Sequence, residues 1–458
     1  MEKQAAMIDE ALPATMRREA LRDKHGRVLI DDKGNVGAGV RTIGGIPRGQ
    51  LSSAAVGNLI EWFDWNAYAF LSVYFAKQFF PANTSTVVAL LGTFGIMAVG
   101  FLMRPIAGLV IGKIADLRGR RFAMLLTVYG MGIAALTMAV VPTYAQIGIL
   151  APLILLAARI IQGICIGGEY GAMSAFAMES SPRGKRGTVA GVLNAVAQSG
   201  QLAVTILVVG ATLLLSATDM TEWGWRLIFG VGAALSIFGI WIRRNMVETA
   251  SDKPAQKHAA GLFASFRAFP KQSLQVVGLT IGFTVMVYAW GSYIPAFAFT
   301  YKGVDPKLGL ISTMISAVVG GIAALALGPV SDKFGRRKTM LAAGLVLAIG
   351  TVPAMNLITS FGTLITFQAL AAVALGMLQV SSMPAYSELF PRQFRAAGLG
   401  FPYALTVGLV GGTAPLVGTQ FAAWNIGAAF PWYLAVLMLI SVVFYARMKE
   451  TAYAPLPE

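Results

Sequence analysis

The sequence predicts an all-α membrane protein of twelve transmembrane helices, arranged as two six-helix halves. The composition, the number of apolar stretches and an internal repeat lead to this prediction. Of the 458 residues, 56% are hydrophobic and only 12% are charged, whereas a soluble domain carries roughly 25% charged residues. The 51 glycines suit membrane helices, where glycine is common. This composition argues against a large soluble globule, a disulfide-bonded secreted scaffold and a disordered chain.

Twelve apolar stretches define the spans, since a helical crossing takes about 20 apolar residues. They cover residues 52–79, 86–111, 122–141, 150–178, 187–215, 223–243, 271–298, 308–331, 339–357, 361–387, 395–424 and 427–446. The polar N-terminal residues contain scattered charges and no apolar core, unlike a signal peptide. The predicted domains are a tail, a six-helix bundle, a central loop, a second bundle and a short tail: 1–50, 51–244, 245–270, 271–448 and 449–458.

The basic residues predict the orientation in the membrane. Alternate loops and both tails together carry 30 of the 36 lysines and arginines, whereas the other loops carry only Lys77, Lys302 and Lys307. By the positive-inside rule, both termini and the loop 245–270 are cytoplasmic. The net charge of +15 is therefore mainly a topology signal, and it implies no nucleic-acid partner. We expect a multi-pass monomer in the inner (plasma) membrane.

The two halves share repeated motifs. The pattern G-x-x-x-D-x-x-G-R-R runs over 112–121 and again over 328–337, each time after the second span of its half. The pattern E-x-x-P-x-x-x-R runs over 179–186 and again over 388–395, after the fourth span. These repeats indicate two parallel halves, an arrangement of transporters whose site lies near the membrane midplane.

These motifs carry a family resemblance. The repeated loop resembles the signature of the major facilitator superfamily. Three first-half segments, 57–64, 101–105 and 159–171, and the Trp-Gly-Trp-Arg segment 223–226 resemble the metabolite:proton symporter family. The resemblance implies a major facilitator fold and proton symport of an organic anion. It points in particular to members that carry a dicarboxylate such as α-ketoglutarate.

Span 1 carries a polar stripe of Asn58, Glu61, Asp64 and Tyr68, which the helical period places on one face. Ionisable groups at this depth are costly and usually face a water-filled cavity. Either acid can therefore bind the coupled proton, and the alternative is a structural ion pair between neighbouring helices. Asp64 is the deeper of the two and is our first candidate, and Tyr68 is a candidate for substrate binding.

Spans 2 and 4 each contain a buried arginine. Arg104 can bind a substrate carboxylate through its guanidinium fork, or it can be a permanent partner of Glu61 or Asp64. On span 4, Arg159 shares a face with Gln162, and we expect both side chains to bind substrate. The resemblance implies that Arg159 pairs alternately with Asp64.

Three further groups complete the candidate site. Glu169, also on span 4, is a possible partner of Arg104 and a further candidate for proton coupling. In the second half, Tyr288 and Trp290 can line the cavity or can serve only core packing. For the loops, the resemblance implies a gating latch that stabilises an outward-facing state, and the alternative is a purely topological role; the latch residues are Asp116, Arg120, Asp332 and Arg336.

Other chemistry has no support in the sequence. The two histidines, His25 and His258, lie in polar segments, so neither a metal site nor a histidine proton relay is predicted within the membrane. Cys165 is the only cysteine, and no P-loop pattern occurs. We expect no enzyme activity and no cofactor, and the partners are a small carboxylate, protons and the lipid bilayer. The alternatives are a symporter of an aromatic, shikimate-like or betaine-like acid, a drug exporter, and a nutrient sensor that does not transport.

Overall fold

The computed structural model describes most of the chain from residue 48 to residue 457. Outside the description lie residues 1–20, 23–27, 31–41, 44–45, 108–110, 112–113, 115–117, 119, 168, 180, 183, 245–263, 392–393, 455 and 458. No side chain is described before residue 57, nor at residues 120, 121, 123, 124, 169, 172, 176, 242–244, 264 and 265. The predicted latch residue Asp116 and the side chains of Arg120 and Glu169 therefore lie outside the described part.

The first half consists of six helical rods. In chain order they are α2 (Arg48–Phe75), α3 (Thr86–Leu102), α5 (Arg120–Val140), α7 with α8 (Leu150–Ile166 and Glu169–Glu179), α9 (Arg186–Leu214), and α10, η3 and α11 (Ala217–Asp219, Met220–Gly224 and Trp225–Arg244). The short turns η2 (Ala76–Phe79) and α6 (Tyr144–Ile147) lie in the connections. In the fourth rod, α7 ends at Ile166 and α8 begins at Glu169, and residue 168 between them lies outside the described residues.

The second half repeats this order. After a short α12 (Ala264–Ala268), the rods are α13, η4 and α14 (Pro270–Val287, Tyr288–Tyr293 and Ile294–Lys302), α15 (Pro306–Phe334), α16 (Arg336–Asn356), α17 (Phe361–Ser387), α18, η6 and α19 (Arg395–Thr406, Val407–Gly411 and Ala414–Ala423), and α20 (Phe430–Arg447). Between the last two rods lies the short η7 (Gly427–Ala429). The fold class of twelve spans in two six-helix halves is thereby confirmed.

Two very short antiparallel strand pairs precede the bundle. They are β1 with β2 (Leu21–Arg22 and Val28–Ile30) and β3 with β4 (Thr42–Ile43 and Ile46–Pro47). Helix α2 begins at Arg48, four residues before the predicted start of span 1. The all-α description therefore holds for the bundle, and the strands belong to the segment ahead of it.

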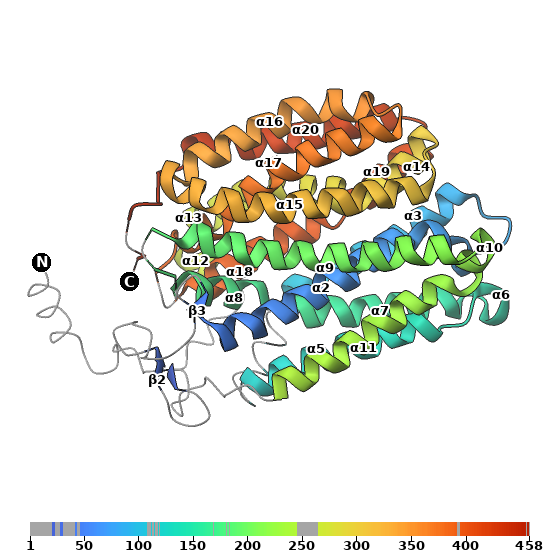
Figure 1. The fold of residues 1–458 in the computed structure, drawn as a ribbon, viewed down its shortest axis with the longest axis horizontal. Helices are drawn as coiled ribbons and strands as arrows, with labels where there is room; N and C mark the ends of the chain where they lie inside the picture. The colour runs from blue at the N-terminus through green and yellow to red at the C-terminus, as the bar shows by residue number, and fades with distance from the viewer. Residues whose placement is uncertain are drawn as a thin grey trace, which may run out of the picture.

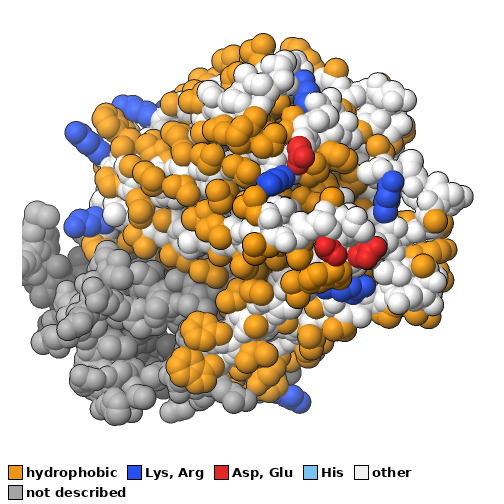
Figure 2. All heavy atoms as spheres, turned by 45° about the vertical axis from the view of Figure 1, so that its right-hand side comes forward, with side chains coloured by type: hydrophobic (Ala, Val, Ile, Leu, Met, Phe, Trp, Pro, Cys, Tyr) orange, Lys and Arg blue, Asp and Glu red, His pale blue; other side chains and the backbone are white. Residues whose placement is uncertain are grey.

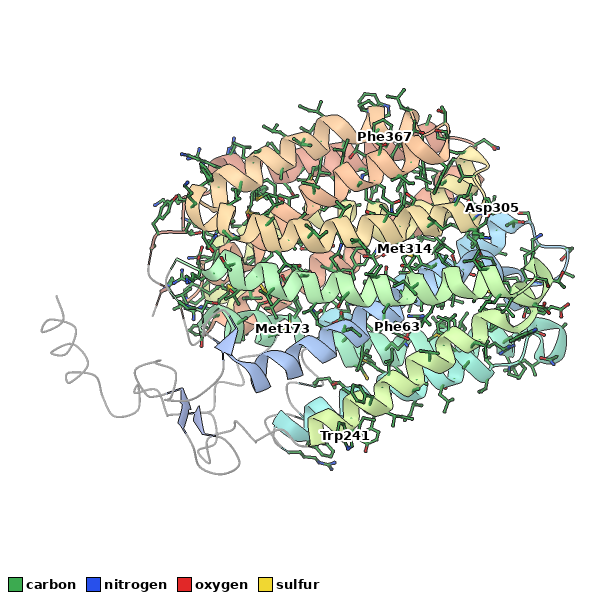
Figure 3. The ribbon with its side chains drawn as sticks, viewed as in Figure 1. Phe63, Met173, Trp241, Asp305, Met314 and Phe367 are labelled. Carbon is green, nitrogen blue, oxygen red and sulfur yellow. The ribbon has the colours of Figure 1, made fainter. Side chains whose placement is uncertain are left out.

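The surface of the bundle is that of a membrane protein. Among the described residues, nine helices are long and apolar enough to cross a bilayer, and α5 and α7 contain shorter apolar helices. Figure 2 shows a largely hydrophobic exterior with isolated charged side chains. Trp241 points outward from α11 (Figure 3) and is 63% exposed. Such exposed apolar side chains are what lipid tails would cover.

The two halves lie side by side along nearly parallel rods, with α9 of the first half against α15 of the second (Figure 1). Glycines allow this close approach. A Cβ at Gly187 would meet the carbonyl oxygen of Gly328 at 2.7 Å, and one at Gly191 would meet the carbonyl oxygen of Ala324. Helices α8 with α18 and α3 with α19 also pack across the boundary. A seam of small residues brings two helices together without large interlocking side chains.

We call the end of the bundle where α9 and α16 begin and α20 finishes the basic end. Four arginines mark it: Arg186, Arg336, Arg395 and Arg447. Lys302 and Asp305 lie at the opposite end, where α14 connects to α15, and Figure 3 labels Asp305 there. The sequence predicts that the basic end is cytoplasmic.

Candidate functional site

A cavity lies between the two halves. Its lining comes from α2, Arg104 just after α3, α7, α8 and α9 on one side, and from α13, η4, α17, α18 and η6 on the other. The lining combines aliphatic residues with aromatic and neutral polar ones, and the latter are Asn58, Trp62, Tyr170, Asn194, Phe283, Thr284, Tyr288, Gln379, Ser382 and Tyr403. Met173 also lines it and lies toward the basic end (Figure 3). Among the described lining residues, only Glu61 and Arg104 carry charge.

Glu61 and Arg104 form an ion pair in this cavity. Arg104 Nη2 lies 3.5 Å from Glu61 Oε1, and the side chains are 9% and 21% exposed for Arg104 and Glu61. The guanidinium also lies 4.6 Å from the ring centre of Trp65 and 4.4 Å from that of Phe101. These cation–π contacts stabilise the charge away from water. Arg104 is thus held in place and still open to the cavity.

Glycines on span 4 bring the backbone of the Arg104 segment close to that span. A Cβ at Gly163 would meet the carbonyl oxygen of Gly100, and a Cβ at Gly167 would meet that of Arg104. Only glycine permits this approach, because any larger residue would push α3 and α7 apart. The packing of α3 on α7 therefore positions Arg104 at the cavity wall.

A second charged cluster lies one helical turn along α2, enclosed by protein. Asp64 is 3% exposed and Arg159 is fully buried, and Arg159 Nη1 lies 3.9 Å from Asp64 Oδ2. Gln162 donates a hydrogen bond from Nε2 to the same carboxylate oxygen. The Arg159 guanidinium lies 3.8 Å from the ring centre of Tyr68, and the Tyr68 hydroxyl donates to the Thr93 carbonyl at 3.0 Å.

This cluster is under-satisfied in hydrogen bonds. Within the described structure, none of the three guanidinium nitrogens of Arg159 has a hydrogen-bond partner, and Asp64 Oδ1 has none. A buried charge without hydrogen bonds is costly unless it is compensated. Here the compensation is a single carboxylate at ion-pair distance together with aromatic faces. An arrangement of this kind is poised to change when the charge of Asp64 changes.

The predicted site residues fall into two groups. Glu61, Arg104 and Tyr288 line the cavity, whereas Asp64, Arg159, Tyr68 and Gln162 form the cluster behind it. Trp290 lies in neither group, because its indole N–H points to Thr351 Oγ1 at 3.4 Å, within the second half. The sequence analysis missed Asn194 and Ser382, because a single neutral polar residue in an apolar span carries no distinctive signal.

The seventh rod contains a π-helical turn, η4, that the sequence did not predict. It places the Tyr288 ring nearly parallel to Trp62 of the other half, at 6.5 Å and 13°. Within the same turn, Ser292 donates to Asn66 Oδ1 at 2.8 Å, and Gln201 donates to the Gly291 carbonyl at 2.9 Å. Both hydrogen bonds cross between the halves. The turn therefore links the halves beside the cavity.

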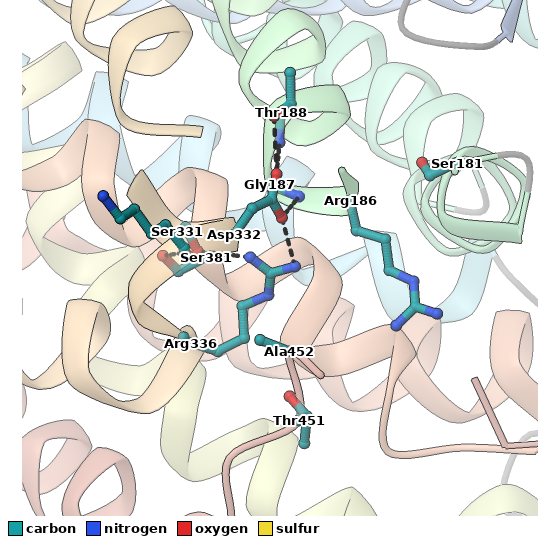
Figure 4. A network of polar contacts seen from close by, with 12 residues as sticks. Ser181, Arg186, Gly187, Thr188, Ser331, Asp332, Arg336, Ser381, Thr451 and Ala452 are labelled. Atoms are coloured by element: carbon teal, nitrogen blue, oxygen red, sulfur yellow. Dashed lines mark hydrogen bonds and ion pairs between the residues drawn. The ribbon is translucent and has the colours of Figure 1, made fainter. Parts of the chain in front are cut away.

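At the basic end, Asp332 joins the second half to the start of α9 (Figure 4). Its Oδ1 accepts from the Gly187 amide at 2.7 Å, and its Oδ2 accepts from the Thr188 amide and hydroxyl at 2.8 Å each. Arg336 Nη2 donates to Asp332 Oδ1 at 2.9 Å. A carboxylate is stabilised at a helix N-terminus by free amides and by the helix dipole. This contact joins the two halves at the basic end.

The E-x-x-P-x-x-x-R repeats add two crossed ion pairs. Arg186 of the first half donates to Glu388 Oε1 of the second at 2.9 Å. Arg395 of the second half donates to Glu179 Oε1 of the first at 2.5 Å. Each repeat thus supplies the acid for the other repeat's arginine. Together with Asp332 these pairs form what we call the latch.

The C-terminal segment lies against the latch. Glu450 accepts from the amides of Arg336 and Arg337 at the start of α16, at 2.8 and 3.1 Å. Arg186 also donates to the Ala454 carbonyl at 3.3 Å, and Arg395 donates to the Pro457 carbonyl at 2.7 Å. Glu450, Ala454 and Pro457 therefore cover the arginines of the latch from the basic end.

Comparison with known proteins assigns the family. Residues 51–250 match the model of the family described as Sugar (and other) transporter, and residues 303–457 match that of the Major Facilitator Superfamily. The alpha-ketoglutarate permease of Escherichia coli (strain K12) is 35% identical over 412 residues, which are 87% of this chain and 94% of that protein. The chain belongs to the major facilitator superfamily.

Other relatives of this superfamily member are named for different substrates. The proline/betaine transporter of Salmonella typhimurium is 31% identical over 89% of this chain and 85% of its own length. The citrate-proton symporter of Klebsiella pneumoniae is 29% identical, covering 90% of this chain and 94% of its own. The chain is thus a multi-pass membrane transporter similar to proton-coupled symporters, and these relatives indicate transport and not catalysis.

Solved structures show the same fold for the transporter. The proton:xylose symporter XylE, bound to 6-bromo-6-deoxy-D-glucose, superposes with a TM-score of 0.70 at 18% identity, covering 89% of this chain and 97% of that one. A partially occluded, inward-open form of XylE from E. coli gives a TM-score of 0.69 at 19% identity, covering 88% and 98%. Both similarities concern the fold alone.

The described residues contain no group of three histidine, cysteine, aspartate or glutamate side chains that would hold a metal ion. The charged groups of the transporter's site are instead arranged as pairs of one acid and one arginine. Such pairs suit the binding of an anion and the exchange of a proton.

Proposed function

We propose that this transporter imports an organic anion together with protons across the inner membrane by alternating access. A dicarboxylate such as α-ketoglutarate is the first candidate substrate. The observation that carries this proposal is the juxtaposition of two ion pairs on α2. Glu61–Arg104 opens to the cavity between the halves, and Asp64–Arg159 is enclosed one turn away.

Arg104 is the proposed anion site. A guanidinium binds a carboxylate through two parallel hydrogen bonds, and the low dielectric of a closed cavity strengthens them. Arg104 Nε is buried without a hydrogen-bond partner in the described structure, so the group has donor capacity to spare. A carboxylate that reaches Arg104 competes directly with Glu61. Protonation of Glu61 removes that competitor, which favours binding of an anion with a proton.

Asp64 is the proposed coupling site. When Asp64 is ionised, Arg159 has a counter-charge 3.9 Å away. When Asp64 is protonated, a fully buried guanidinium loses that counter-charge, and the enclosed arrangement becomes unfavourable. The two protonation states therefore favour different arrangements of α2 and α7. A protonation-dependent equilibrium of this kind is what symport requires.

The latch is the proposed gate of the basic end. Opening that end requires Asp332 to leave the start of α9 and the crossed pairs Arg186–Glu388 and Arg395–Glu179 to separate. Closing it again restores all of these contacts. We propose the same role for Asp116 and Arg120 as for Asp332 and Arg336, on the strength of the shared motif.

The proposed orientation has the basic end, both termini and residues 245–270 in the cytoplasm. The basis is the positive-inside rule, since 30 of 36 basic residues belong to that side. The proposed units are the tail 1–50, the bundles 51–244 and 271–448, and the tail 449–458. We propose that the functional unit is a monomer, because the cavity is formed between the two halves of one chain.

A zwitterion of the betaine type is the second candidate substrate. The cavity presents a carboxylate and a guanidinium of opposite sign within 3.5 Å, and it is lined by aromatic rings such as Trp62 and Tyr288. Aromatic faces bind quaternary ammonium groups. Glu61 would then face the ammonium group and Arg104 the carboxylate. The relatives named for proline and betaine support this candidate.

Uptake into proteoliposomes tests the proposal. Purified protein is reconstituted with an imposed pH gradient, acidic outside, and radiolabelled α-ketoglutarate or glycine betaine is supplied in parallel. We expect α-ketoglutarate to accumulate above the outside concentration and the accumulation to collapse with a protonophore. Accumulation of betaine alone would favour the second candidate. Binding of either compound without accumulation would instead indicate a sensor.

A further inference from the structure

Gln162 hydrogen-bonds to the enclosed carboxylate instead of facing the cavity. Its side chain is fully buried, and it does not belong to the cavity lining. Its amide nitrogen donates to Asp64 Oδ2, while Arg159 Nη1, 3.9 Å from the same oxygen, makes no hydrogen bond within the described structure. The direct hydrogen bond to the Asp64 carboxylate therefore comes from a neutral amide and not from the arginine.

Charged and polar groups face Asp64 from several helices. Helix α7 contributes the charge of Arg159, and α2 itself contributes Tyr68 and, one turn earlier, Glu61 with its partner Arg104 on the α3 side. Helix α11 contributes Gly232, and a Cβ added at this glycine would lie 3.8 Å from Asp64 Oδ1. Helix α9 carries no acid, and its only basic residue is Arg186, at its start. The turn η4 contributes Tyr288, which stacks on Trp62.

The carbonyl oxygen of the Gln162 amide is available for a further hydrogen bond. Gln162 Oε1 is buried and has no hydrogen-bond partner in the described structure. A primary amide has donors on one side and an acceptor on the other, and the two sides have nearly the same shape. Rotation about the last side-chain bond therefore exchanges donor for acceptor without needing extra space. The partner across from it, Asp64, is an acceptor when ionised and gains a donor when protonated.

We propose that Gln162 is a positioning residue whose amide follows the charge of Asp64. It donates through Nε2 to the carboxylate and accepts through Oε1 from the protonated acid. The idea rests on the proposed function in that Asp64 is taken as the coupling site. Asp64 then keeps a hydrogen bond in both protonation states, and only the pairing with Arg159 changes between them. The amide also sets the pH at which the proton is exchanged.

Loss of the Gln162 amide should shift the pH at which Asp64 loses its proton in a defined direction. A hydrogen bond donated to a carboxylate favours the ionised form. Gln162→Met removes both this bond and the bond accepted from the protonated acid. The bond to the carboxylate is charge-assisted and about twice as strong, so its loss dominates and Asp64 should hold its proton to a higher pH. A hydrogen bond to a charged group corresponds to about a tenfold change in proton affinity, or roughly one pH unit. A residue that served packing alone would lower the amount or activity of the protein without moving this midpoint.

Infrared titration of the purified protein gives the most direct test. The carbonyl band of the protonated acid is assigned to Asp64 by its loss in Asp64→Asn, and its pH midpoint is compared between wild type and Gln162→Met. Gln162→Met keeps the length of the side chain and removes both polar functions. We expect the midpoint to rise by about one pH unit, the scale set by one charged hydrogen bond. Gln162→Asn, which keeps an amide one methylene shorter, should shift it less.

A matched control is Gln368→Met in the second half. Gln368 is also a buried amide, hydrogen-bonded to the Trp290 carbonyl and to Thr313 Oγ1, but it contacts no acid in the described structure. We expect this variant to leave the Asp64 midpoint unchanged, whatever it does to the rate of transport. An Asp64 midpoint that stays in place or falls in both Gln162 variants would overturn the proposal.

The titration separates this idea from the proposed function. If Asp64→Asn still accumulates substrate in a pH gradient, the coupling role of Asp64 is wrong, while the infrared midpoint still decides whether Gln162 controls the proton on Asp64. If coupling does depend on Asp64, the pH profile of proton-driven uptake should shift upward in Gln162→Met by the same amount as the infrared midpoint. Exchange of labelled substrate at fixed pH verifies that each variant is folded.

Discussion

Arg186 and Glu388, 202 positions apart in the sequence, join the two halves of the transporter through a 2.9 Å ion pair. Both side chains are buried, at 6% and 2% exposure for Arg186 and Glu388. The equivalent pair, Arg395 with Glu179, joins the same halves, with the arginine now in the second half and the acid in the first. Duplication has thus produced a symmetric contact, in which each half contributes one acid and one base. The contact lies at the one end of the bundle that the sequence marks as cytoplasmic.

The first prediction concerns this latch. Glu388→Gln keeps the size of the side chain and removes its charge, so the basic end should open more often. Breaking a hydrogen bond to a charged group should shift the closed–open equilibrium by about 1–3 kcal/mol. A cysteine introduced at Ser382, in the cavity lining, should then react faster with a thiol reagent applied from the cytoplasmic side.

Asp305→Asn provides the matched control, because Asp305 caps the start of α15 at the opposite end. It should leave the labelling rate at residue 382 unchanged. Equal labelling rates in Glu388→Gln and in the parent would show that the latch does not restrain the basic end.

The second prediction concerns Arg104. Arg104→Lys keeps the charge but loses the two-pronged geometry that matches a carboxylate. Substrate binding measured by calorimetry should weaken by about 1–3 kcal/mol. The control is Arg226→Lys, whose arginine donates to the Ala139 and Val141 carbonyls, away from the cavity. Unchanged affinity in a folded Arg104→Lys protein would assign Arg104 a structural role as the partner of Glu61.

The third prediction concerns the pH dependence of binding. Glu61 and an anionic substrate compete for Arg104, so protonation of Glu61 at lower pH should tighten binding in the wild type. Glu61→Gln removes the competing charge, and it should bind a dicarboxylate more tightly with a flatter pH dependence. The same calorimetric titrations, repeated at several pH values, measure both effects. Weaker binding of betaine in this variant, without a gain for dicarboxylates, would support the zwitterion candidate instead.

The sequence predicted the fold well because its signals are strong and redundant. Hydrophobic length places each span, and the repeats at 112–121 and 328–337 fix the pairing of the halves. What the sequence missed are local departures from a regular helix. The π-turn η4 makes tertiary contacts, such as the hydrogen bond from Gln201 to the Gly291 carbonyl. No residue pattern within the span itself predicts such contacts.

The charged residues of the candidate site could be predicted, but their division into a cavity pair and an enclosed pair could not. Buried charge in a membrane is rare, so Glu61, Asp64, Arg104 and Arg159 stand out in the sequence. Helical period alone places Glu61 and Asp64 on one stripe. It does not show that the first opens to the cavity and the second is enclosed by Gln162 and Arg159. That separation arises from the packing of α7 on α2 and α3, which only the folded structure displays.

The central claim is that the enclosed carboxylate of Asp64 couples protons to transport. Asp64→Asn imitates the protonated form permanently, and it should be compared with wild type in proteoliposomes for two activities. One is uptake of α-ketoglutarate driven by a pH gradient alone, and the other is exchange of labelled for unlabelled substrate at equal pH. We predict that Asp64→Asn loses gradient-driven accumulation and retains measurable exchange. Accumulation against a concentration gradient by Asp64→Asn, driven only by protons, would contradict the account.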